Sequence, residues 1–159
     1  LKQLNTKNEV SFNSKKFSRS FFDKLNLKFD LAYGRLNYSK KLFISDTIFQ
    51  CKGNINLLEE FPLLFFDCSV NSETKSELLK KFNIDIKKDN KIFNLKFKGN
   101  LNILNRKINF KDISLNENYK ASIEDLKYFK ESFENILFND DFVGIFNLNK
   151  IKDYILDIS

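Results

Sequence analysis

The chain of 159 residues contains no histidine, tryptophan or methionine, and only one proline, four glycines and two cysteines. Without histidine, no Ser-His-Asp or Cys-His arrangement and no histidine-ligated zinc site can form. Cys51 and Cys68 are too far apart for a Cys-x-x-Cys clamp, and no Gly-x-Ser-x-Gly, Walker or dinucleotide-binding motif occurs. We therefore expect a protein that is not an enzyme, with no catalytic residue, metal or cofactor.

The scarcity of proline and glycine also leaves no stretch that looks like a flexible linker. Residues 1–159 are therefore expected to form a single domain. The sequence begins at Leu1 rather than at methionine, so we expect a piece of a longer protein. No stretch approaches the ~20 apolar residues that a membrane-spanning helix needs. Any export signal or membrane anchor is accordingly expected upstream of Leu1.

Arginine is rare too, although the chain carries a formal net charge of +6. Arg19, Arg35 and Arg106 are outnumbered by lysines that are scattered among asparagine, isoleucine and phenylalanine. Recognition of nucleic acid favours the planar guanidinium group and a clustered basic footprint. We expect no nucleic-acid partner, whereas a weak affinity for anionic lipid headgroups is compatible with the charge.

What the chain does contain is a repeat. The pattern Gly-x-apolar-Asn-apolar begins at Gly34, Gly53 and Gly99, and residues 52–58 and 98–104 share Lys-Gly-Asn-aliphatic-Asn-aliphatic-Leu. Repeats of this kind favour β units stacked side by side over a core with one special pocket. The glycines either relieve crowding on a twisted sheet or leave room for a ligand's acyl chain.

Alternation of period two accompanies the last two repeats. Between residues 93 and 103 the odd positions are apolar or glycine, whereas the even positions are lysine or asparagine. Residues 49–57 alternate in the same way, with Gln50, Lys52, Asn54 and Asn56 at the even positions. This alternation predicts strands with one apolar and one polar face. The residues that we expect on the apolar face, as candidates for a ligand-binding groove, are Phe49, Cys51, Gly53, Ile55, Leu57, Phe93, Leu95, Phe97, Gly99, Leu101 and Ile103.

An earlier stretch alternates in the same way, with apolar odd positions from 25 to 33. The phase changes beside Gly34, which predicts a bulge or bend there. Return strands are expected at residues 41–45, 63–70 and 107–115, after turns that include Ser39-Lys40 and Asn105-Arg106. Connections this short predict antiparallel hairpins in series.

The two cysteines are compatible with two states. A hairpin that pivots on Glu59 and Glu60 would place Cys51 opposite Cys68, where a disulfide can form. Such a hairpin needs a two-residue turn, and Glu-Glu lacks the tolerance of positive φ that these turns favour. A looser loop with a shifted register, and two buried free thiols, is therefore the favoured prediction.

Helices are expected between and after the hairpins. Ser72 is placed to cap a helix over residues 73–82, Ser122 begins a capping box before an apolar periodicity, and residues 148–157 form a third helix. Phe17 and Phe21 are spaced for a short helix. The adjacent acids Asp140 and Asp141 are interpreted as a solvated turn rather than metal ligands. The fold class is α+β and mostly β: a curved antiparallel sheet of serial hairpins with amphipathic helices packed on or at its end.

The order of these elements resembles the carboxy-terminal region of bacterial AsmA-like proteins. The stretches that carry the likeness are FKGNLNI at residues 97–103, RKINFKDI at 106–113 and NYKAS at 118–122, before the longest expected helix. The likeness extends from about residue 25 to the end of the chain. It implies a carboxy-terminal fragment of a longer protein whose repeating β-sheet forms a groove for lipid.

The resemblance also implies a role and a place. AsmA-like proteins are anchored in the inner membrane by an amino-terminal helix, extend into the periplasm, and take part in phospholipid transport and outer-membrane maintenance. The expected partners are phospholipid acyl chains, which a continuous apolar face would shield from water. The alternative is a structural or protein-interaction module whose apolar face is fully internal. A nucleic-acid binder ranks behind both.

Overall fold

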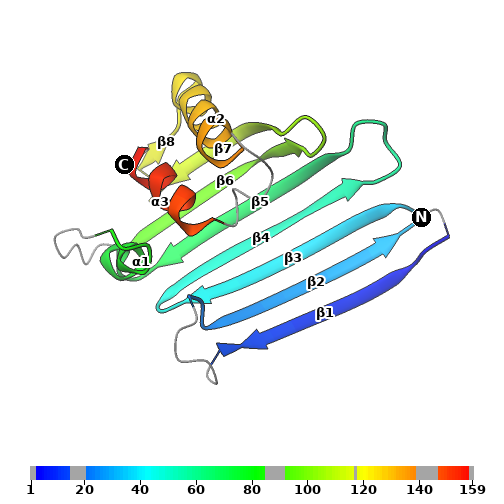
Figure 1. The fold of residues 1–159 in the computed structure, drawn as a ribbon, viewed down its shortest axis with the longest axis horizontal. Coiled ribbons are helices and arrows are strands. Elements are labelled where there is room, and N and C mark those ends of the chain that lie inside the picture. The colour runs from blue at the N-terminus through cyan, green and yellow to red at the C-terminus, as the bar shows by residue number, and fades with distance from the viewer. Residues whose placement is uncertain (1–2, 15–20, 85–91, 117, 139–146, 158–159) are drawn as a thin grey trace.

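The computed structural model describes residues 3–14, 21–84, 92–116, 118–138 and 147–157 (Figure 1). Within these residues eight strands form one sheet and three helices lie beside it. The elements are β1 (Thr6–Asn13), β2 (Lys24–Ala32), β3 (Arg35–Ile44), β4 (Thr47–Asn56), β5 (Leu63–Ser72), α1 (Lys75–Lys81), β6 (Phe93–Asn102), β7 (Lys107–Leu115), β8 (Tyr119–Lys120), α2 (Ile123–Leu137) and α3 (Leu148–Asp157).

The sheet is an open antiparallel meander in which the spatial order of the strands is their order in the chain. Each strand from β2 to β7 therefore pairs with the strand before it and the strand after it, and β1 and β8 are the edge strands of the described sheet. The prediction of an α+β fold built mostly from serial antiparallel hairpins is confirmed. β1 was not predicted, because only Val10 and Phe12 supply apolar side chains at alternate positions there.

The first predicted turn was wrong. Tyr33 and Gly34 form the turn between β2 and β3, with φ of 50° and 78°, and β3 then continues through Ser39 and Lys40. Two consecutive residues with positive φ match the right-handed twist of the flanking strands, which favours such tight hairpins. The change of phase beside Gly34 therefore marks a hairpin turn, not a bulge. The turn predicted at Asn105-Arg106 is confirmed, and Arg106 has a φ of 57°.

The helices largely follow the prediction. α2 begins with the capping box of Ser122, whose hydroxyl accepts a hydrogen bond from the backbone N–H of Asp125 at 3.1 Å. α3 has the predicted bounds. Thr74 occupies the N-cap position of α1, without a capping hydrogen bond from its side chain. Ser72, the predicted cap, still belongs to β5 and accepts a hydrogen bond from the Thr47 hydroxyl at 2.8 Å. The predictions for Phe17, Asp140 and Asp141 lie outside the described residues.

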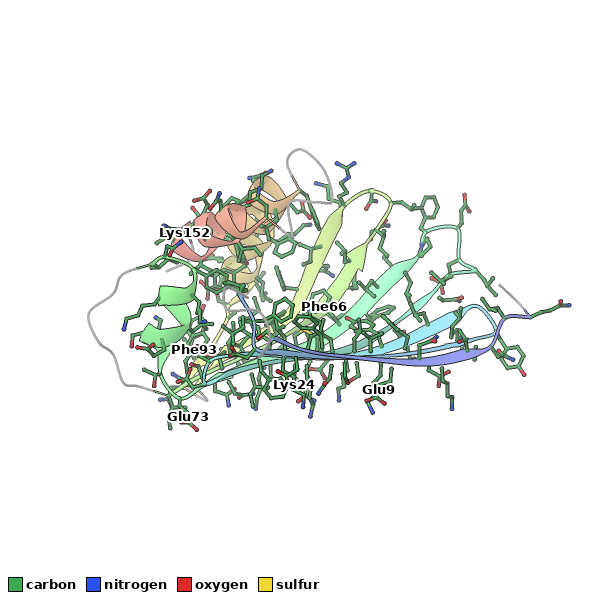
Figure 2. All side chains as sticks on the ribbon, turned by 60° about the horizontal axis from the view of Figure 1, so that its bottom comes forward. Glu9, Lys24, Phe66, Glu73, Phe93 and Lys152 are labelled. Carbon is green, nitrogen blue, oxygen red and sulfur yellow. A yellow bond between two sulfur atoms is a disulfide. The ribbon has the colours of Figure 1, made fainter. Side chains whose placement is uncertain are left out.

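All three helices lie on one side of the sheet (Figure 2). Phe66 points to this side, whereas Glu9 and Lys24 point to the other (Figure 2). We call the two surfaces the helix-side face and the polar face. The alternation predicted for β6 is confirmed: Lys96 and Lys98 are exposed on the polar face, and Leu101 is buried on the helix-side face.

No helix within the described ranges is both long enough and apolar enough to cross a membrane.

Candidate functional site

The helix-side face is built from side chains that stand in rows across the strands. Residues directly opposite each other in an antiparallel pair point to the same face, so the register defines each row. The four rows that cross the middle of the sheet run from β1 to β7 as follows: Thr6, Leu31, Leu36, Ile55, Leu64, Leu101 and Ile108; Asn8, Phe29, Tyr38, Gly53, Phe66, Gly99 and Phe110; Val10, Leu27, Lys40, Cys51, Cys68, Phe97 and Ile113; and Phe12, Leu25, Leu42, Phe49, Val70, Leu95 and Leu115.

The repeat glycines share one of these rows with aromatic rings. Gly53 lies between Tyr38 and Phe66, and Gly99 lies between Phe66 and Phe110. A Cβ atom added at Gly99 would meet the carbonyl oxygen of Asn109 and would lie 2.7 Å from Cζ of Phe66. The same addition at Gly53 would meet the Phe65 carbonyl oxygen. The glycines therefore allow close backbone approach, as expected for relief of crowding on a twisted sheet.

Cys51 and Cys68 form a disulfide in the third row, so the favoured prediction of two free thiols was wrong. The register that pivots on Glu59 and Glu60 is present, and Cys51 pairs directly with Cys68. The connection from Asn56 to Leu63 is longer than two residues, yet it is centred on the same pivot, so it leaves the register unchanged. With a sequence separation of 17, the crosslink stabilises the fold by about 3 kcal/mol in the chain-entropy model.

The helices cover one part of the helix-side face and pack over five of the predicted groove residues: Phe49, Phe93, Leu95, Phe97 and Leu101. One cluster joins α1 and α3 to Phe49, Val70, Phe93 and Leu95. A second cluster joins α2 to Leu101, Ile108, Phe110 and Ile113 on β6 and β7. Phe97 packs against both clusters. Over β4–β7 the apolar face is thus mainly a filled core under helices.

The other predicted groove residues occupy different surroundings. Ile55 is buried on β4, and Cys51 and Gly53 are half-buried beside it. Leu57 and Ile103 lie beyond the ends of β4 and β6, in the connections to the next strands. These two therefore do not extend the rows.

A further part of the helix-side face lies on β1–β3, where the described residues place no helix (Figure 1). Its apolar side chains belong to neither core cluster. Val10 is 49% exposed, and the others are half-buried. We call this surface the bare section and define it by Val10, Leu27, Phe29, Leu31, Leu36, Tyr38 and Lys40. The sequence prediction named none of these residues as site residues. The alternation over residues 25–33 was the signal that could have indicated the bare section.

Lys40 is the charged member of the bare section. It lies between Leu27 on β2 and Cys51 on β4, and its side chain has no hydrogen bond or ion pair among the described residues. Desolvation by these neighbours lowers the pKa of its ammonium group, although the residue remains partly exposed. Desolvation also raises the pKa of the Tyr38 hydroxyl.

The polar face carries a shallow depression of about 410 Å³ near Gly53 and Gly99. Asp67 lines it, 3.5 Å from the ammonium nitrogen of Lys98 and 4.0 Å from that of Lys52. Such exposed ion pairs contribute between zero and about 1 kcal/mol each. The described residues contain no cluster of cysteine, aspartate and glutamate that could hold a metal ion.

Comparison with known proteins finds no matching family model, no matching curated protein and no matching solved structure. The function is therefore argued from the geometry of the helix-side face.

Proposed function

We propose that this chain is part of a non-enzymatic, AsmA-like protein that shields phospholipid acyl chains during transport between membranes and so maintains the outer membrane. The observation that supports the proposal is the bare section, an apolar surface continuous with the helix-covered core. Water contact with an apolar surface of this kind is unfavourable, and contiguous exposed apolar patches mark sites of interaction. Each CH₂ group of an acyl chain that the surface shields contributes about 0.8 kcal/mol.

The dimensions of the bare section suit one phospholipid. Residues 27–31 of β2, which belong to the bare section, span roughly 14 Å at about 3.4 Å per residue. Half of the ~30 Å hydrocarbon core of a bilayer, the length that one leaflet's acyl chains fill, is about 15 Å. An acyl chain lying along β2 and β3 would therefore be shielded over nearly its whole length on one side.

The disulfide supports a location for this activity. Disulfides persist in oxidising compartments such as the bacterial periplasm and are rare in the cytosol. We propose a periplasmic location, with anchorage in the inner membrane through a segment outside this chain. The alternative, a protein-interaction module with a fully internal apolar face, is less well supported, because Val10 is 49% exposed within the described part of the chain.

The proposal is tested by measuring retained lipid and the transfer of labelled phospholipid between vesicles for the wild type, Leu27→Asn and Lys28→Asn. These positions are adjacent on β2 and face opposite sides of the sheet. We expect Leu27→Asn to retain and transfer several-fold less phospholipid, and Lys28→Asn to match the wild type. Melting temperatures distinguish lost binding from lost folding. Equal retention by both folded variants, or none by the wild type, would refute acyl-chain shielding here.

A further inference from the structure

The headgroup that accompanies those acyl chains is indicated by Lys40. On its own strand, the nearest residues on the same face are Tyr38 and Leu42, and across the strands they are Leu27 and Cys51. Such neighbours are about 5 Å away across the sheet and about 7 Å away along a strand. None of them is negatively charged. In the four middle rows of the described sheet, Lys40 is the single charged position.

The lysines of the polar face are in a different situation. Lys28 lies 3.1 Å from the carboxylate of Glu9, and Lys98 lies 3.5 Å from that of Asp67. Lys40 is exposed, yet it stands among apolar neighbours and has no such partner among the described residues. These neighbours partly desolvate its ammonium group, which lowers its pKa. A bound anion would supply the missing partner, and the surrounding apolar surface requires that this anion carry hydrocarbon.

We propose that the bare section binds an anionic phospholipid, with the Lys40 ammonium group against the headgroup phosphate and the acyl chains along the apolar rows of β1–β3. This inference rests on the proposed function and adds the charge class of the lipid. A zwitterionic headgroup brings its own ammonium group, for which the described bare section offers no carboxylate. Tyr38 lies two residues along β3 on the same face, about 7 Å away along the backbone, and its hydroxyl is a second hydrogen-bond donor for the phosphate.

The test is a competition between two lipids in one mixture. The chain is incubated with vesicles that contain equal amounts of phosphatidylglycerol and phosphatidylcholine with identical acyl chains, then separated from them, and the retained lipids are quantified by mass spectrometry. We expect the wild type to retain phosphatidylglycerol in several-fold preference, because the quaternary ammonium group of phosphatidylcholine offsets the attraction between its phosphate and Lys40. Lys40→Gln should bring the ratio close to one without lowering the melting temperature.

The matched control is Lys41→Gln. Lys41 is the next residue of β3 and faces the opposite side of the sheet, between Asn26 and Gln50. Its replacement by glutamine removes the same charge from the chain. Its lipid ratio should equal that of the wild type, as should the ratio of Lys40→Arg, which keeps the cation. Attraction of the whole basic chain to the vesicle surface would instead lower the preference of both glutamine variants equally.

The outcomes separate this inference from the proposed function. An unchanged ratio in Lys40→Gln, with phospholipid still retained, would overturn the headgroup assignment and leave acyl-chain shielding intact. Retention of no phospholipid by any variant would overturn both. Inorganic phosphate that binds at Lys40 while no lipid is retained would identify a free-phosphate site. Sedimentation as a dimer that excludes lipid would identify a second copy of the chain as the occupant. Either result would overturn the inference.

Discussion

At the scale of single residues, the repeat glycines are best understood together with the rings beside them. Tyr38, Phe66 and Phe110 alternate with Gly53 and Gly99 along one row. The rings of Phe66 and Phe110 are 6.1 Å apart, although their strands are separated by β6. An aromatic ring beside a glycine compensates for the side chain that the glycine lacks. The row thus stays filled while the backbones approach closely.

This arrangement predicts the effect of Gly99→Ala. The added Cβ would contact the Asn109 carbonyl oxygen, which belongs to the backbone and cannot rotate away. We expect a loss of about 1–3 kcal/mol in the free energy of unfolding, as for other overpacked positions, measured by urea denaturation. Asn100→Ala, on the opposite face of β6, is the control and should cost less. Equal stability of Gly99→Ala and the wild type would show that the position tolerates a side chain.

Residue patterns predicted some members of the rows well and Lys40 badly. The alternation of β6 gave the correct face for Phe97 and Lys98, because each apolar position was followed by a polar one. Lys40 shares a face of β3 with Leu36, Tyr38 and Leu42. Because Ser39-Lys40 is a polar pair, it was predicted as a turn instead. Only the register, which places Leu27 and Cys51 on either side of it, assigns Lys40 to the bare section.

At the scale of elements, capping explains why α2 was the most predictable helix. The Ser122 hydroxyl and the Asp125 carboxylate each accept a hydrogen bond from the other residue's backbone N–H. These bonds satisfy amides that the first turn of a helix leaves without partners. The hydrogen bond from the backbone N–H of Ser122 is the main cause that lowers the pKa of Asp125, and hydrogen bonds from the side chains of Tyr119 and Ser122 add to it.

The lowered pKa predicts a pH dependence. Because the pKa of Asp125 is depressed in the folded state, its stabilising contribution is present above the unfolded value and is lost as the pH falls through the folded pKa. Asp125→Asn should therefore unfold at a lower urea concentration than the wild type near neutral pH, and the gap should close in strong acid. A gap that persists unchanged in acid would mean that the charge of Asp125 does not stabilise the fold.

Connections between elements were harder to predict. The six residues between Asn56 and Leu63 keep the register that a two-residue turn would impose. The expectation that a longer loop shifts the register therefore gave the wrong pairing for the cysteines. Likewise, nothing local distinguishes a phase change at a bulge from one at the hairpin turn of Tyr33 and Gly34. Both outcomes depend on which strands pair.

At the scale of the whole molecule, charge in the middle of the described sheet lies on the polar face, with Lys40 as the exception. The polar face carries lysines paired with carboxylates, including Lys7 with Asp30 and Lys120 with Asp112. The sequence could not predict which part of the helix-side face the helices cover, because β2 and β6 have the same alternation of apolar and polar residues. α2 packs over β6 and β7, whereas the described helices leave β2 bare.

The distribution of charge predicts weak binding to nucleic acid. Lysines that are neutralised by neighbouring carboxylates release few counterions from a phosphate backbone, so the affinity should be low and its dependence on salt shallow. We expect anisotropy of a labelled single-stranded oligonucleotide to rise only at low ionic strength and to return to baseline at physiological salt. Submicromolar binding with sequence preference at that salt would contradict this prediction.

The meander order also determines how such a sheet can assemble and change in length. Because each strand's partner is the next strand along the chain, most pairings close only a short loop, which keeps the loss of loop-closure entropy small at each step. Folding can begin at any hairpin and extend outward strand by strand, as in other repeat architectures. Insertion or deletion of one hairpin would preserve the existing pairing of the other strands. Adding or removing hairpins would therefore change the width of the apolar surface and leave the fold the same.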